Sequence, residues 1–135
     1  MRLATTLSSF VFLAAATPAD SQDQARVVAP DFSKATSRSA AKALATKGVL
    51  TKILFFPAEL GGEDVKDNVG YITLEAFADR ERIIAKLSKL RSEGRIDKLT
   101  VVPEYKGRSF VPSKIVFRTA LGQKPGTFNP VIVIW

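Results

Sequence analysis

One stretch near the middle of the chain has the clearest periodicity in the sequence: TLEAFADRERIIAKLSKLRSEG, residues 73–94. Thr73 is typical of a helix N-cap, and Gly94 stands where a glycine commonly follows a helix C-terminus. An amphipathic helix buries its apolar stripe against another element. The stretch therefore predicts one helix packed on a sheet, with its apolar residues at helical spacing: Ala76, Phe77, Ile83, Ile84, Leu87 and Leu90.

The segments around this helix are rich in β-branched and aromatic residues and are bounded by turn residues, which is typical of strands. Two of them precede the helix and three follow it: 49–56, 68–74, 95–105, 113–121 and 129–135. Short connections join the last three, and they favour an antiparallel meander. The predicted fold class is α+β: an antiparallel sheet of about five strands, ordered β-β-α-β-β-β, with one amphipathic helix on one face.

The N-terminus has the pattern of a secretory signal peptide. Arg2 is followed by the apolar residues 3–16, and the small residues Ala14 and Ala16 have the spacing that signal peptidase reads. Cleavage after Ala19 is an alternative. We expect residues 1–19 to be a signal peptide, the protein to be secreted or periplasmic, and no stable membrane span to remain after cleavage.

Residues 20–48 are rich in Ala, Ser and Lys and show little periodicity. A short helix is conceivable over 40–47, but a helix of that length is marginal without packing. We expect a flexible linker at 20–48 and a compact domain at 49–135. The chain has no cysteine, so its domain has to be held together by its core alone.

The chain also has no histidine, which together with the lack of cysteine excludes thiol nucleophiles, Cys/His metal sites and a Ser-His-Asp triad. The sequence predicts no cofactor, no metal and no catalytic residue. The formal net charge of +7 favours anionic partners, although such a charge can also serve solubility alone.

Four carboxylates fall close together in FFPAELGGEDVKDN, residues 55–68: Glu59, Glu63, Asp64 and Asp67. A metal site, an acid/base pair and a solvated loop are the alternatives. The stretch does not fit the register of an EF-hand loop, and a lysine stands among the acids. Neighbouring carboxylates on an exposed loop do not form a glycosidase pair across a cleft. We interpret the stretch as a solvated loop between strands, and loops of this kind often serve as contact surfaces.

The C-terminal part of the chain is strongly basic, with six cations and one acid after residue 97. We predict a binding role for four of these cations: Lys106, Arg108, Lys114 and Arg118. A protein or an anionic envelope polymer is the expected partner, and a plain solvated face is the alternative. Aromatic residues between the cations are also found on nucleic-acid platforms, but the export signal disfavours that partner.

Arg80 and two serines complete the candidates. Arg80 lies near the apolar stripe of the helix, so either its head reaches water or it binds a carboxylate or phosphate. Ser109 and Ser113 lie near lysines in the sequence, but no S-x-x-K motif supports a Ser-Lys dyad.

The function that these features favour is a small exported, non-enzymatic binding domain. The alternative is a small hydrolase that uses carboxylates, drawn from Glu59, Glu63, Asp64 and Glu104. A cleft that brings two of these carboxylates together would favour the enzyme, and a flat basic sheet without such a cleft would favour the binding domain.

Overall fold

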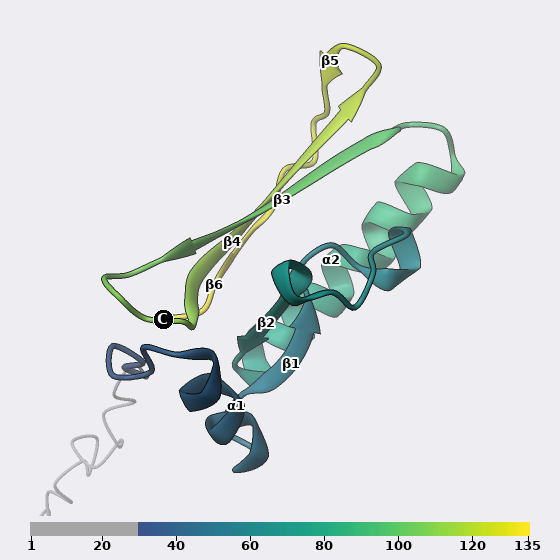
Figure 1. Ribbon diagram of the computed structural model, residues 1–135. Helices are drawn as coiled ribbons and strands as arrows, with labels where there is room; N and C mark the ends of the chain where they lie inside the picture. The colour runs from purple at the N-terminus through teal and green to yellow at the C-terminus, as the bar shows by residue number, and fades with distance from the viewer. Residues whose placement is uncertain (1–29) are drawn as a thin grey trace, which may run out of the picture.

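A computed structural model of the chain describes residues 30–135 (Figure 1). The predicted signal peptide, 1–19, and the first part of the predicted linker lie outside the described residues. Among the residues that are described, no helix has the length and apolar character needed to cross a bilayer.

The described residues form an α+β fold with antiparallel sheets, as the sequence predicts. The strands lie in two sheets, of two and four strands, and not in a single sheet of about five. Two α-helices are present where one was predicted. In chain order the helices and strands are α1 Arg38–Thr46, β1 Thr51–Leu54, β2 Val69–Ile72, α2 Leu74–Ser92, β3 Lys98–Tyr105, β4 Pro112–Leu121, β5 Lys124–Pro125 and β6 Val131–Val133, with short 3-10 turns at Ala58–Leu60 and Lys66–Asn68.

The larger sheet is built around β4, which pairs with β3 on one side and with β5 and β6 on the other. The pleat of β4 sends alternate side chains to opposite faces. Ile115, Phe117 and Thr119 are buried on the inner face, and Lys114 and Arg118 are exposed on the outer face. This is the alternation that the sequence of the strand predicts.

Helix α2 covers the inner face and contacts both β6 and β1 (Figure 1). Thr73 caps it, since its side chain accepts a hydrogen bond from the Ala76 amide at 3.3 Å. The residue after the helix C-cap, Gly94, has a positive φ of 70°, which favours glycine at that position. The predicted helix is confirmed, and its buried residues include Ile84 and Leu87.

The structure differs from the sequence prediction over 30–48, where a flexible linker was expected. Ser37 caps α1 through a 3.1 Å bond from the Ala40 amide, and Ala41 on that helix is completely buried. Before the helix, Phe32 packs edge-on against Trp135, with 5.9 Å between the ring centroids. Tertiary packing therefore stabilises a helix too short to be predicted on its own.

The prediction that follows from this core concerns Leu87, which is fully buried together with Ile115 and Phe117. Truncation of a buried leucine to alanine typically costs about 2–5 kcal/mol. We expect Leu87→Ala to lower the urea midpoint of unfolding sharply. Lys89→Ala, on the exposed side of the same helix, should leave the midpoint nearly unchanged, since its 3.9 Å pair with Glu93 is a surface contact. Equal midpoints for the two variants would show that α2 does not support the core.

Candidate binding surface

The five residues predicted to bind a partner do not converge on one site. Lys114 and Arg118 share the outer face of the larger sheet. Lys106 and Arg108 lie in the turn between β3 and β4, at one end of that sheet. Arg80 is buried in α2.

The outer face presents a row of valines across three neighbouring strands. Val116 of β4 lies between Val102 of β3 and Val131 of β6 in the register of the sheet. Val102 and Val131 keep 39% and 50% of their surface exposed, and the neighbouring Val133 keeps 65%. An exposed apolar patch of this kind, rimmed by polar residues, is typical of an interaction surface.

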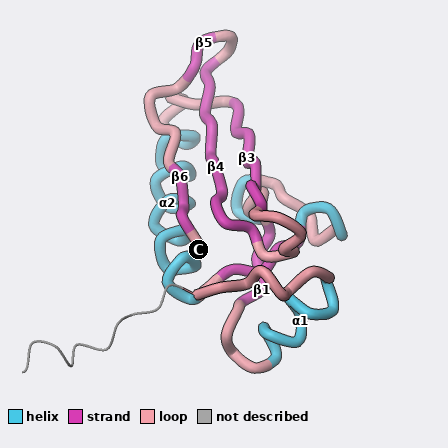
Figure 2. Tube along the Cα trace, turned by 90° about the vertical axis from the view of Figure 1, so that its left-hand side faces the viewer, coloured by secondary structure: helices cyan, strands magenta, loops and turns pink. Residues whose placement is uncertain are grey.

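Charged residues surround these valines on the same face. Lys114 is paired across the sheet with Glu104 on one side and with Val133 on the other, and Arg118 is paired with Thr100. Lys98 adds a third cation, whereas Glu104 is the one carboxylate among the strand residues of this face. Figure 2 shows β3, β4 and β6 side by side, with α2 behind β6 and therefore on the opposite side of the sheet from this face. We call this set the outer face: Lys98, Thr100, Val102, Glu104, Lys114, Val116, Arg118, Ala120, Val131 and Val133.

The predicted cations of the β3–β4 turn lie in a different environment. The Lys106 ammonium lies 4.8 Å from the centroid of the Trp135 ring. Nearby, the Arg38 guanidinium lies 4.9 Å from the centroid of the Phe110 ring. Cation–π contacts of this kind tie the turn to α1 and to the C-terminus. Burial raises the pKa of Tyr105, and the charge of Arg38 opposes that rise.

Arg80 is a structural cation in this fold. Its side chain is 6% exposed, so its head does not reach water as one of the two sequence interpretations expected. The guanidinium donates to the Leu54 carbonyl at 2.6 Å and to the Glu81 carboxylate at 3.1 Å. Burial lowers the pKa of Arg80, while the charges of Glu81 and Glu59 raise it. The contact with Leu54 joins α2 to β1.

Asn68 closes the acidic stretch 55–68 into an ordered loop. Its side-chain amide donates to the carbonyls of Phe56 and Glu63, both at 3.0 Å, and its oxygen accepts from the Phe56 amide at 2.7 Å. Asp64 pairs with Lys52 at 2.9 Å. Within residues 30–135, no group of three or more metal-ligating side chains is present. The residue that signals this closure in the sequence is Asn68, and it was not among the predicted candidates.

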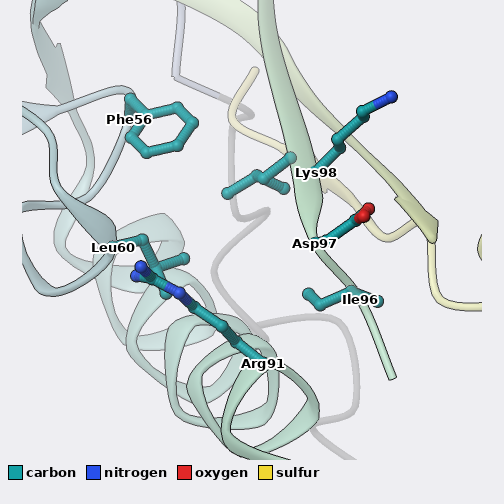
Figure 3. Close-up of a pocket in the computed structure, with 7 residues that line it drawn as sticks. Phe56, Leu60, Arg91, Ile96, Asp97 and Lys98 are labelled. Carbon is teal, nitrogen blue, oxygen red and sulfur yellow. The ribbon is translucent and has the colours of Figure 1, made fainter. Parts of the chain in front are cut away.

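A small pocket of about 120 Å³ lies between the loop and the start of β3 (Figure 3). Phe56 and Leu60 line one side, and Arg91 reaches toward them from α2. Asp97 and Lys98 point away from the pocket, because both bond to Gly122 in the turn beyond β4. Asp97 is the one lining residue with a carboxylate, so no pair of carboxylates faces across the pocket.

The four carboxylates proposed for hydrolysis are divided between two parts of the fold. Glu104 lies on the outer face, while Glu59, Glu63 and Asp64 lie in the loop between β1 and β2. The two serines considered for a dyad are buried and donate to backbone carbonyls, Ser109 to Phe32 and Ser113 to Glu104. Neither forms a hydrogen bond with a lysine in the described part of the chain.

The comparisons with known proteins identify no relative. No family model, curated protein or solved structure matches the chain.

The closure of the acidic loop gives a stability prediction. Asn68→Ala leaves the part-buried amide and carbonyl of Phe56 without their side-chain partner, which typically costs about 1–3 kcal/mol of unfolding free energy. Glu63→Ala and Asp67→Ala, which remove exposed loop carboxylates, should change it by less than about 0.5 kcal/mol. Urea titration of the three variants checks this. A calcium-dependent rise in melting temperature that Glu63→Ala abolishes would instead reveal a metal site.

Proposed function

We propose that this chain is a non-enzymatic binding domain and that it contacts another protein through its outer face. The observation that carries the proposal is the row Val102, Val116 and Val131, in which the two outer valines are exposed and Val116 is half-buried. Lys114 and Arg118 border this row on β4. The partner that fits is a protein surface with apolar residues at its centre and carboxylates around them.

The two parts of this surface have different roles. Covering exposed valines contributes affinity, because it removes apolar surface from water. The cations contribute orientation, faster association and selection against other cationic surfaces. An anionic envelope polymer would satisfy the cations but would leave the valines without apolar neighbours, so a protein partner fits the face better.

The setting of the proposal is the periplasm or the extracellular space. It rests on the sequence pattern of residues 1–19, with the single cation, the apolar stretch and the small residues of a signal peptide.

The test is a selection of random twelve-residue peptides against the full chain at low salt. We expect enrichment of peptides that combine carboxylates with apolar residues. The tightest of them should bind the double variant Lys114→Glu/Arg118→Glu at least about tenfold more weakly, since the change reverses two charges of the face. The matched control, Lys34→Glu/Lys42→Glu, changes the net charge equally at exposed sites near and on α1 and should keep the affinity.

Other results would overturn the proposal. Equal weakening by both double variants would indicate attraction by net charge alone. A lack of enriched acidic peptides, combined with tight binding of inorganic polyphosphate that depends on Lys114 and Arg118, would indicate an anionic polymer as the partner.

A further inference from the structure

The larger sheet has two edges within the described residues. One edge is formed by β3 and the other by β5 and β6, and each of these strands pairs with β4 alone. An edge strand presents unpaired backbone groups to which another chain can add, unless the sequence protects it.

The hydrogen bonds of β4 determine which backbone groups point out of each edge. The Phe117 amide donates to the Pro130 carbonyl at 2.9 Å, and the Ile134 amide donates to the Ser113 carbonyl at 2.8 Å. In an antiparallel pair, alternate residues direct their backbone groups toward the partner strand. The even-numbered residues of β6 therefore face β4, and the N–H and C=O groups of Val131 and Val133 point away from it.

The edge formed by β3 is protected. Phe117 and Thr119 direct their amides toward the β6 side, so the residues opposite them on β3 direct their backbone groups outward. Pro103 is one of these outward residues, and it has no N–H to donate. A register shift between Glu104 and Tyr105 interrupts the same edge. Proline and local irregularity are both devices that prevent strand addition.

The edge formed by β6 has neither device along its outward residues. The register directs the backbone groups of Val131 and Val133 away from β4. Outside the strand ladders, no backbone hydrogen bond of residues 30–135 involves either residue. Both side chains are at least half exposed. Helix α2 passes behind β6 in Figure 2, on the inner face, and does not take the place of a neighbouring strand.

Charge indicates which segment would add there. Lys86 of α2 lies 4.3 Å from the centroid of the Phe128 ring, just before β6 begins, and Lys114 lies across from Val133 on the outer face. A second copy of this chain would bring the same cations and a net charge of +7 against this edge, which is repulsive. An acidic segment of another protein is therefore favoured.

We infer that an extended segment of an acidic partner adds as a strand along β6. Its backbone pairs with the outward N–H and C=O groups of Val131 and Val133, and its apolar side chains lie beside the two valines on the outer face. This inference rests on the proposed function, because it specifies how the same partner engages the same face.

The experiment uses the full chain and the tightest acidic peptide from the selection described above. Val133→Pro and Val133→Ala both remove the exposed isopropyl group, but the proline alone also removes the outward N–H. Neither change removes a backbone group that Ile132 or Ile134 directs toward β4. We expect Val133→Pro to bind the peptide about tenfold more weakly than Val133→Ala does. A loss of this size corresponds to one lost backbone hydrogen bond and a weakened adjacent one.

A second measurement keeps the inference testable if Val133→Pro does not fold. In the unmodified protein saturated with peptide, amide exchange at Val131 and Val133 should slow. A peptide that carries N-methyl groups at alternate residues should fail to bind in one of its two registers.

The outcomes separate the two proposals. If the Val131 and Val133 amides exchange at the same rate with and without peptide, strand addition is wrong, whereas a specific loss of affinity in Lys114→Glu/Arg118→Glu would still support the outer face as the binding surface. Sedimentation that shows a dimer which Val133→Pro dissociates would identify a second copy as the occupant and overturn the acidic partner. If no acidic peptide is enriched, both proposals fail.

Discussion

The packing of α2 against the inner face of the larger sheet is the contact on which the rest of the structure depends. Leu87, Ile115 and Phe117 have no exposed surface, and the chain has no cysteine with which to reinforce this layer. A helix that buries one face of a sheet leaves the opposite face without a layer of its own. The exposed valines of that opposite face follow from this two-layer arrangement. In β6, for example, all three positions are apolar, so Ile132 is buried on the inner face while Val131 and Val133 are exposed.

The elements that the sequence predicts well are those determined by local pattern. The periodicity and the caps of α2 lie within one stretch, and the alternation of β4 gives the two faces of the sheet directly. The second helix was not predicted, because α1 is short and is stabilised by contacts with distant residues, such as that of Phe32 with Trp135. The division into two sheets was missed for a related reason. Strand partners are selected by long-range packing, on which local composition carries little information.

The candidate surface could be predicted in part for the same reasons. Alternation along β4 places Lys114 and Arg118 on one face, but it cannot bring together residues from three strands before their register is known. For Arg80, the sequence shows the position of the residue but not its hydrogen-bond partner. Its position on the apolar stripe of α2 was visible in the sequence, but the carbonyl of Leu54 that accepts its hydrogen bond is brought to it by tertiary structure alone. The contribution of Val131 and Val133 to the outer face was not predicted, because a short, continuous apolar run is equally typical of a fully buried strand.

Two features of β6 combine at one place on the molecule. Its outward backbone groups form an edge, and the side chains of Val131 and Val133 extend the apolar row of the outer face to that edge. A partner strand would therefore gain backbone hydrogen bonds, which depend little on its sequence, and side-chain contacts, which depend strongly on it. Selectivity then has to come from the side chains and the flanking charges, since any extended segment can supply the backbone groups. Pro103 and the register shift at Glu104/Tyr105 disfavour strand addition at the β3 edge. Under the proposed mode of binding, a partner strand would be directed to the β6 edge, where the valines and Lys114 would discriminate between partners.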